Sequence, residues 1–530
     1  MKIKLIILVL ALNILFAFSQ STETEFHVIP APISSISYAK IKSFDTVVKI
    51  AVAVKAIDEG KMLQKCLLSD FGLKSVIIKN SKDADIVLTL NSDKAKSEAY
   101  TLEINSKICI SSNATSGLFY GIQSLRQIIK KNGNKYIVQK GKITDSPTFS
   151  WRAFMLDEGR YFKGKQAVKQ LLDEMALLKM NVFQWHLTDD QGWRIEIKKY
   201  PKLTQIGSFR DSTEINHFGS NVFDGKPHAG FYTQTDIKEI VAYATKLHIQ
   251  IIPEIEMPGH SSAAIAAYPC LGTSGKQIKV PCSFGPKIDI YNVSDPKVLE
   301  FFNDVFDEII SLFPANIIHI GGDEARYEQW TESKQIQDYM KQNGLSTPNE
   351  LQVFFTNNIY KLLKSKNKRM MGWNEITGDK IHKFQEGASD KSETQKLQKS
   401  AIVQFWKGDS ILLLNTLKNG NKIVNSNNVM SYLDYDYKSI PLSKAYSFNP
   451  IPSGTSASLS TQVLGLSCQM WGEFIPTIES MNFKVYPRLA AYAERGWTQP
   501  DKINYNRFKN SLPYFLNHWE SIGIIYGPTN

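Results

Sequence analysis

The feature that most constrains the fold is a regular alternation of short apolar runs with amphipathic stretches, which begins near residue 150. Short apolar runs predict buried β-strands, and apolar residues at every third or fourth position predict α-helices. The strand-like runs occupy residues 153–156, 181–187, 250–255, 317–320, 369–372, 401–405, 423–432 and 463–470. The helical patterns occupy residues 166–178, 235–247, 297–312, 349–365 and 486–494. Successive βα units of this kind predict an α/β fold, a (β/α)8 TIM barrel, over residues 148–500.

The residues before this alternation are expected to form a smaller, separate domain. Residues 23–145 mix strand-like runs at 86–90 and 100–104 with a helical pattern at 118–129, which indicates an α+β domain. A turn-rich stretch separates this region from the first strand of the barrel. After the last βα unit, residues 501–530 are expected to form a helical extension packed on the barrel.

Residues 1–20 have the pattern of a signal peptide. Lys2 and Lys4 precede an apolar run of about 14 residues, and small residues follow it. A membrane anchor is the alternative, but a transmembrane helix needs about 20 apolar residues. No later segment is apolar enough to cross a bilayer. We therefore expect an exported protein, periplasmic, cell-surface or secreted, without a membrane span once the signal peptide is removed.

Charge and cysteine content exclude several classes of function. Lys and Arg total 62 against 51 Asp and Glu, a net charge of +11, but the basic residues are spread along the chain. Without a basic patch, no nucleic-acid partner is expected. Five cysteines with no CxxC pair exclude a disulfide framework and a structural zinc site. Cys270 and Cys282 could still form one disulfide, and the alternative with all five cysteines reduced is equally favoured.

Carboxylates and indoles gather at the C-terminal ends of the predicted strands, which is where TIM barrels carry their active sites. Indole rings pack against the apolar faces of sugars, whereas carboxylates and Arg bind sugar hydroxyls. Carboxylates also serve acid catalysis of glycosidic cleavage, so a sugar site is predicted. The strand-end residues are Asp157, Glu158, Arg160, His186, Asp189, Asp190, Trp193, Glu254, Glu256, His260, His319, Asp323, Glu324, Trp373, Glu375, Trp406, Tyr432, Asp434, Trp471 and Glu473.

A metal-dependent hydrolase is a competing interpretation of the same residues. The side chains that could bind a metal ion are His260, His319, Asp323 and Glu324. No tight histidine spacing accompanies them, and indoles are poor neighbours for a hydrated ion. We therefore expect no metal and no other cofactor.

Four motifs follow one another along the barrel: LTDDQGWR at 187–194, PEIEMPGH at 253–260, HIGGDE at 319–324 and WGE at 471–473. In this order they resemble the motifs of family 20 glycoside hydrolases, the β-N-acetylhexosaminidases. The stretch GLFYGIQSL at 117–125 is similar to the family's small domain. The resemblance implies an exo-acting β-N-acetylhexosaminidase that releases terminal N-acetylglucosamine or N-acetylgalactosamine from glycans or chitooligosaccharides. A catalytically inactive glycan-binding protein on the same fold is the alternative.

The resemblance also implies a retaining, substrate-assisted mechanism. Because Asp323 and Glu324 are adjacent, their side chains diverge and are not the facing carboxyl pair of an ordinary retaining enzyme. Instead, the substrate's acetamido oxygen would attack the anomeric carbon and form an oxazolinium ion. Glu324 would be the general acid and then the base, its pKa raised by Asp323. Asp323 would stay ionised and orient the acetamido N–H, and Tyr432 would hydrogen-bond the acetamido oxygen.

By the same resemblance, further residues would bind the sugar or adjust the acid. Indole walls would enclose the acetamido group, polar residues would bind the terminal hydroxyls, and a histidine–carboxylate pair would tune Glu324. In that order, these residues are Trp373, Trp406 and Trp471; Arg160, Asp434 and Glu473; and His260 with Asp189.

Overall fold

The fold is described from a computed structural model that covers most of the chain. The described residues are 24–91, 98–385, 387–389 and 392–530. The predicted signal peptide, residues 1–20, lies outside them. None of the described helices is long and apolar enough to cross a membrane.

The chain divides into two compact units. Among the described residues, the first unit holds those up to Thr148 together with Thr498–Tyr514, and the second holds those in Phe149–Trp497 together with Phe515–Asn530. The segment 501–530, expected to be one extension packed on the barrel, is therefore shared between the two units.

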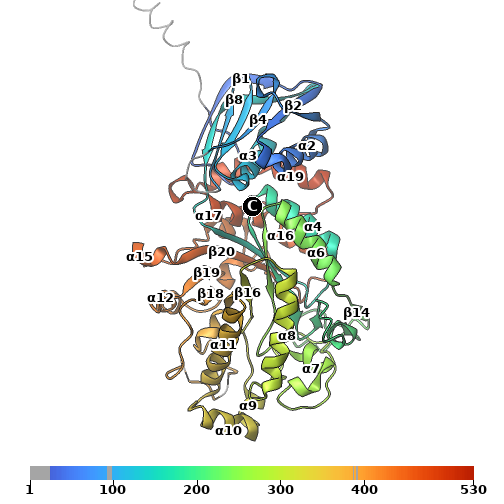
Figure 1. Cartoon of the computed structure of the whole chain (residues 1–530), viewed down its shortest axis with the longest axis vertical. Coiled ribbons are helices and arrows are strands. Elements are labelled where there is room, and N and C mark those ends of the chain that lie inside the picture. The colour runs from blue at the N-terminus through green and yellow to red at the C-terminus, as the bar shows by residue number, and fades with distance from the viewer. Residues whose placement is uncertain (1–23, 92–97, 386, 390–391) are drawn as a thin grey trace, which may run out of the picture. The chain divides into compact units, whose positions relative to one another are not determined.

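A mixed sheet forms the first unit. Its strands are β1 (Ser34–Ser43), β2 (Val47–Val52), β3 (Lys74–Ile78), β4 (Ile86–Leu90), β5 (Tyr100–Ile104), β6 (Ile108–Ser112), β7 (Lys130–Asn132) and β8 (Lys135–Asp145). They are ordered β1-β8-β5-β6-β4-β2-β3, with β7 beside β8. Burial alternates along β5 and β6, as in a sheet that packs through one face. Helices α2 (Ile57–Phe71) and α3 (Thr115–Ile128) pack against the sheet and each other (Figure 1), which confirms the predicted α+β class.

Within the described residues, eight parallel strands of the second unit close into a barrel. They are β9 (Trp151–Asp157), β10 (Val182–His186), β15 (Gln250–Glu254), β16 (Ile317–His319), β17 (Arg369–Trp373), β18 (Ile402–Phe405), β19 (Lys422–Asn425) and β20 (Val463–Met470). Almost every strand residue is buried, because side chains fill the barrel and helices cover it. The predicted (β/α)8 TIM barrel is confirmed.

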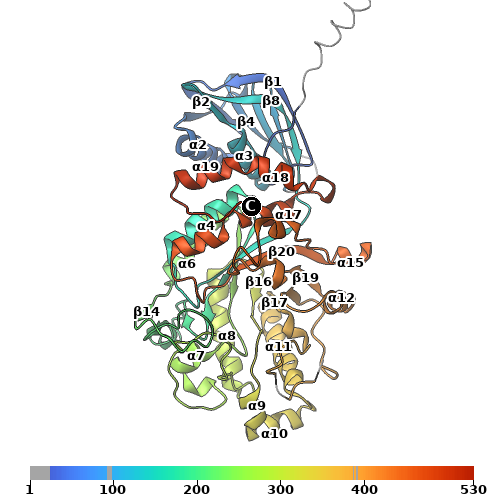
Figure 2. The same ribbon diagram turned by 180° about the vertical axis from the view of Figure 1, so that it is seen from behind.

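Helices cover the outside of the barrel, and each of the five helical sequence patterns lies on one of them. They are α4 (Lys165–Leu177), α6 (Gln234–Lys246), α8 (Pro296–Leu312), α11 (Pro348–Ser365) and α17 (Arg488–Trp497). Two views show α4 and α6 side by side (Figure 1, Figure 2). The start of α6 follows from local chemistry, because the Thr233 and Asp236 side chains each accept a hydrogen bond from the other residue's backbone N–H in a capping box.

The seventh barrel strand is shorter than predicted. The expected strand covered 423–432, but β19 ends at Asn425, and a short helix, α13 (Asn428–Ser431), follows. The Asn425 side chain accepts a hydrogen bond from Asn427 N and donates one to Pro450 O. Side chains that bind nearby backbone compete with the strand ladder, which explains the early end. Tyr432 nevertheless returns to the barrel through an isolated bridge to Gln469.

The structure decides between the two cysteine alternatives. All five cysteines lie among the described residues, and each carries a free thiol. Cys270 is exposed and Cys282 is half-buried, with no disulfide between them. The fold is therefore held by its packed cores rather than by covalent links.

Candidate active site

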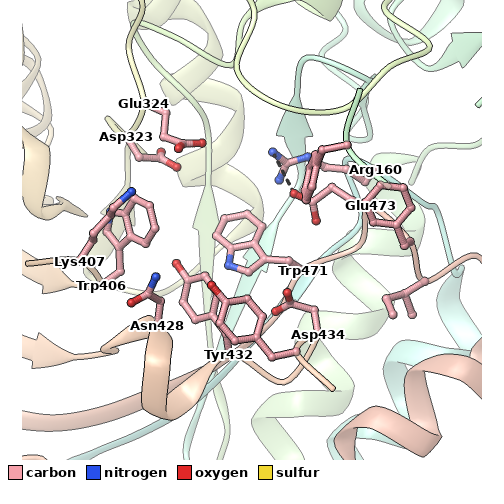
Figure 3. Close-up of a pocket in the computed structure, with 14 residues that line it drawn as sticks. Arg160, Asp323, Glu324, Trp406, Lys407, Asn428, Tyr432, Asp434, Trp471 and Glu473 are labelled. Carbon is pink, nitrogen blue, oxygen red and sulfur yellow. Dashed lines mark ion pairs between the residues drawn. The ribbon is translucent and has the colours of Figure 1, made fainter. Parts of the chain in front are cut away.

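The carboxyl ends of the barrel strands surround a pocket of about 310 Å³ (Figure 3). This volume lies near the lower end of the range for small-molecule sites. Eight of the eleven predicted site residues line it: Arg160, Asp323, Glu324, Trp406, Tyr432, Asp434, Trp471 and Glu473. The other three, Asp189, His260 and Trp373, are buried behind this lining.

Asp323 and Glu324 lie next to each other on one side of the pocket (Figure 3), on the loop after β16. Gly321 and Gly322 turn the chain there with φ angles of 62° and 98°, which glycine adopts without a steric penalty. A Cβ at Gly321 would lie 1.8 Å from Glu256 Oε2. Glu324 itself has a φ of 47°, an unusual value for a residue with a side chain. The backbone turn that presents both carboxyl groups to the pocket therefore requires glycine at positions 321 and 322.

The surroundings of Asp323 disfavour its negative charge. Burial raises the pKa of Asp323 to about 7, with Glu375 and Glu324 adding to the shift and His260 opposing it. Its Oδ1 atom is buried and has no hydrogen-bond partner among the described residues. At neutral pH Asp323 is therefore divided between its protonated and ionised forms in the protein alone. A ligand N–H donor at Oδ1 would favour the ionised form.

A buried histidine lies behind this pair. His260 Nδ1 is 3.3 Å from Asp189 Oδ1 and 3.3 Å from Asp190 Oδ2. Its Nε2 is 3.8 Å from an oxygen of Asp323 and 3.8 Å from one of Glu324. Burial lowers the pKa of His260, but Asp189 and Asp323 outweigh it and hold the pKa well above its usual value. His260 is therefore a positive charge that faces both pocket carboxyl groups.

The structure separates the four candidate metal ligands. His260, Asp323 and Glu324 come together, but His319 Nδ1 instead lies 3.1 Å from Glu254 Oε1 in the barrel interior. Of the four candidate ligands, only His260, Asp323 and Glu324 therefore offer donor atoms close enough together to bind one ion. The positive charge that Asp189 and Asp323 favour on His260 opposes such binding, because a histidine must be neutral to bind a metal ion.

Stacked aromatic rings form the wall and floor of the pocket. The rings of Trp406 and Tyr432 are nearly parallel, with centroids 6.0 Å apart. The ring centroids of Trp373 and Trp471 are 5.7 Å apart. Trp373 is fully buried and donates its Nε1–H to Glu254 Oε1 at 2.8 Å. Trp373 therefore supports the floor from below rather than lining the pocket. Burial raises the pKa of Tyr432 well above its usual value, so its hydroxyl stays protonated and can donate.

The side of the pocket opposite Glu324 is polar (Figure 3). Arg160 Nη1 lies 2.9 Å from Asp189 Oδ2, and Nη2 lies 3.9 Å from Glu473 Oε1. Burial raises the pKa of Asp434 to about 8, and Glu473 adds to the shift. The buried Asp434 Oδ1 has no hydrogen-bond partner among the described residues. A guanidinium beside carboxyl groups that can hold a proton offers both donors and acceptors, as sugar hydroxyls require.

Sequence reasoning missed six residues that line the pocket: Phe218, Lys407, Asn428, Tyr435, Phe474 and Ile475. Lys407 directly follows Trp406, and Phe474 directly follows Glu473, so adjacency to a predicted residue was the available signal. Phe218 lies in the long loop between β13 (Phe209–Arg210) and β14 (His228–Ala229) and packs edge-on against Phe474 at 5.0 Å. No local sequence pattern marks that long-range contact.

Family comparisons cover both units of the chain. The family described as glycosyl hydrolase family 20, catalytic domain, matches residues 149–500. The one described as glycosyl hydrolase family 20, domain 2, matches residues 25–146.

Individual relatives are similar over most of the chain. A β-hexosaminidase of Porphyromonas gingivalis is 36% identical over 81% of the chain, and one of Vibrio furnissii is 33% identical over 78%. The chain spans only 55% of the first relative's length and 67% of the second's.

Solved structures of similar proteins have the same fold as this chain. The exo-β-N-acetylglucosaminidase of Vibrio harveyi, solved in complex with N-acetylglucosamine, superposes with a TM-score of 0.82 at 27% identity. That match covers 95% of this chain and 80% of the other. A chitobiase of Flavobacterium johnsoniae superposes with a TM-score of 0.80 at 30% identity, over 94% of this chain and 73% of the other.

Proposed function

The chain belongs to glycoside hydrolase family 20, and we propose that it is an exo-acting β-N-acetylhexosaminidase that removes terminal N-acetylglucosamine or N-acetylgalactosamine from glycans or chitooligosaccharides. One observation carries this proposal. A single sugar-sized pocket has Asp323 and Glu324 at one end, Arg160 and two protonatable carboxyl groups at the other, and aromatic rings between them. The N-acetylglucosamine bound to the Vibrio harveyi enzyme supports the choice of substrate.

In the proposed reaction, Glu324 handles the proton. Its side chain is 25% exposed, so a leaving group at the pocket mouth can reach it. As the acetamido oxygen of the substrate attacks the anomeric carbon, the glycosidic bond breaks and Glu324 protonates the departing oxygen. Water then attacks the oxazolinium ion, and Glu324 takes a proton from that water. Two displacements at the same carbon retain its configuration.

Asp323 and Tyr432 would direct the acetamido group in this reaction. Asp323 Oδ1, which has no partner among the described residues, is suited to accept the acetamido N–H. That contact and the positive charge on the nitrogen both favour ionised Asp323 as the ring closes. The protonated Tyr432 hydroxyl would donate to the acetamido oxygen and hold it for attack. The remaining rings would exclude water that competes with this internal nucleophile.

The polar end of the pocket accounts for exo action. Arg160, Asp434 and Glu473 would bind the hydroxyls at the non-reducing end of the sugar. We expect these side chains to close the pocket beyond one sugar unit, so that the substrate enters by its chain end.

Hydrolysis of a 4-nitrophenyl β-N-acetylglucosaminide, compared with the matching β-glucoside, tests the proposed function. We expect cleavage of the acetamido sugar alone, with no loss of rate in a chelator, because the nucleophile belongs to the substrate. Cleavage of both glycosides would refute substrate assistance, and inactivation by chelator would favour a metal-dependent hydrolase. Binding of N-acetylglucosamine without turnover would indicate a glycan-binding protein.

The substitution Tyr432→Phe should lower kcat by about 100-fold, the usual cost of losing one donor to a reacting oxygen, and change KM by less than about threefold. The hydrogen bond matters most while the acetamido oxygen attacks, so binding should suffer little. Tyr339→Phe, the same change on the distant α10 (Lys334–Gln342), serves as the control. If Tyr432→Phe raises KM and leaves kcat intact, Tyr432 only binds the sugar.

A further inference from the structure

A second histidine, which the mechanism above does not use, faces the general acid. His260 Nε2 lies 3.8 Å from Glu324 Oε2, and on the other side His382 Nδ1 lies 3.6 Å from Glu324 Oε1. His382 follows the short 3-10 helix η4 (Asn374–Thr377) and is only 5% exposed. The carboxyl group of Glu324 is thus flanked by one imidazole on each oxygen.

The contacts of His382 identify which of its nitrogens carries the proton. Its Nε2 lies 3.1 Å from Glu375 Oε1, and a carboxylate can only accept, so Nε2 donates. Lys407 Nζ lies 3.2 Å from Nδ1, and an ammonium group can only donate, so Nδ1 accepts. Both contacts favour the same neutral imidazole. Its lone pair is on the nitrogen that faces Glu324.

The imidazole ring is also held firmly in this orientation. It stacks between the rings of Phe384, at 4.7 Å, and Trp406, at 5.7 Å. The Glu375 carboxylate that accepts from His382 also accepts from Trp406 Nε1 at 2.9 Å and from Glu324 N at 3.5 Å. One carboxylate therefore ties together the backbone of the general acid, the imidazole and the pocket wall.

We propose that His382 is a positioning residue for the proton cycle of Glu324. This role rests on the proposed function. Protonated Glu324 can take the place of the Lys407 ammonium, which lies 3.2 Å from Nδ1, as the donor to this one lone pair. This needs only a small rotation of its carboxyl group, since 3.6 Å is just beyond hydrogen-bond distance. The bond keeps the acid in the pocket until the glycosidic oxygen of the substrate takes its place as acceptor. The transferred proton moves between Glu324 and the substrate or water, and His382 serves only as a hydrogen-bond acceptor.

This role predicts a loss that depends on the leaving group. Holding an acid in reactive geometry speeds only the steps in which that acid transfers its proton. N,N′-diacetylchitobiose has a sugar leaving group that needs a proton. A 2,4-dinitrophenyl β-N-acetylglucosaminide has one that needs none. A merely structural histidine would affect both substrates alike.

The test measures both substrates with His382→Ala, His382→Gln and a matched control, Lys383→Ala, at the exposed next position. His382→Ala should lower kcat/KM for diacetylchitobiose by about 10- to 50-fold, a fraction of full acid catalysis, and for the dinitrophenyl glycoside by less than about threefold. KM should stay nearly constant for both. His382→Gln, whose amide oxygen can accept from protonated Glu324 and whose NH2 group can donate to Glu375, should recover most of the loss. Lys383→Ala should match the wild type.

Each other outcome rejects a defined part of the argument. Equal losses on the two substrates, or a change in KM alone, would overturn the positioning role of His382. If His382→Ala does not fold, judged by its melting temperature, His382→Gln decides: a remaining loss that is larger on diacetylchitobiose than on the dinitrophenyl glycoside supports the role, and an equal loss on both refutes it. A wild type that cleaves neither substrate would overturn the proposed function itself, together with the role of His382.

Discussion

Glu324→Gln should lower kcat/KM for N,N′-diacetylchitobiose by about 1,000-fold, within the range that a general acid contributes. Glutamine keeps the size and shape of the side chain but has no acidic proton. A dinitrophenyl leaving group needs no proton, so kcat/KM for that glycoside should fall by only about tenfold or less. Its kcat should fall further, because the same carboxylate must activate water in the second step.

The control for this prediction is Glu332→Gln, the same change at an exposed position on α9 (Glu328–Glu332). It should leave both kinetic parameters unchanged. A Glu324→Gln enzyme that loses the same factor on both substrates would contradict the acid assignment. The proton would then come from another group, and the position of Glu324 at the pocket mouth would serve binding only.

The barrel was predictable from sequence because its signal is local and repeated. Each strand is a short apolar run, and each covering helix has its own periodicity and often its own cap, as at Thr233. The end of the barrel that carries the pocket was predictable for a related reason. In a parallel barrel all the strands end on one side, so residues that follow strands must converge, as Arg160, Asp323 and Glu473 do.

The features that sequence reasoning missed depend on contacts between distant segments. β19 ends at Asn425, whose side chain accepts from Asn427 N and also donates to Pro450 O, a partner 25 residues away. The pKa of Asp323 depends on its burial and on the Glu375 carboxylate as well as on its sequence neighbour Glu324. Neither the burial nor the contact with Glu375 can be inferred from the local sequence. His382 comes from a loop without a motif, and only the folded chain brings it to Glu324.

The ionisation of Asp323 links stability to catalysis. Its pKa is about 7 in the folded protein, above the ordinary carboxyl value, so folding favours the protonated form. The stability that comes from this preference is fully present below about pH 4 and is lost as the pH rises through 7. At pH 8 the folded protein carries the whole cost of a buried, poorly compensated charge, on the order of a few kcal/mol.

Asp323→Asn should therefore lower activity and raise stability together. The amide can still lie beside the acetamido group, but it cannot stabilise positive charge there, so kcat should fall by about 100- to 1,000-fold. The melting temperature should rise by several degrees at pH 8 and by less at pH 5, where wild-type Asp323 is mostly protonated. Wild-type kcat/KM should decline as the pH falls below 7, and the variant should lack this dependence on Asp323.

Melting curves of both proteins at pH 5 and pH 8, together with pH–rate profiles, measure these effects. Asp338→Asn, on the exposed face of α10, controls for the loss of one negative charge and should shift neither quantity. A lower melting temperature for Asp323→Asn at pH 8 would mean that ionised Asp323 stabilises the fold through His260. Such a result would reverse the sign of the argument, because the charge needed for catalysis would then carry no cost in stability.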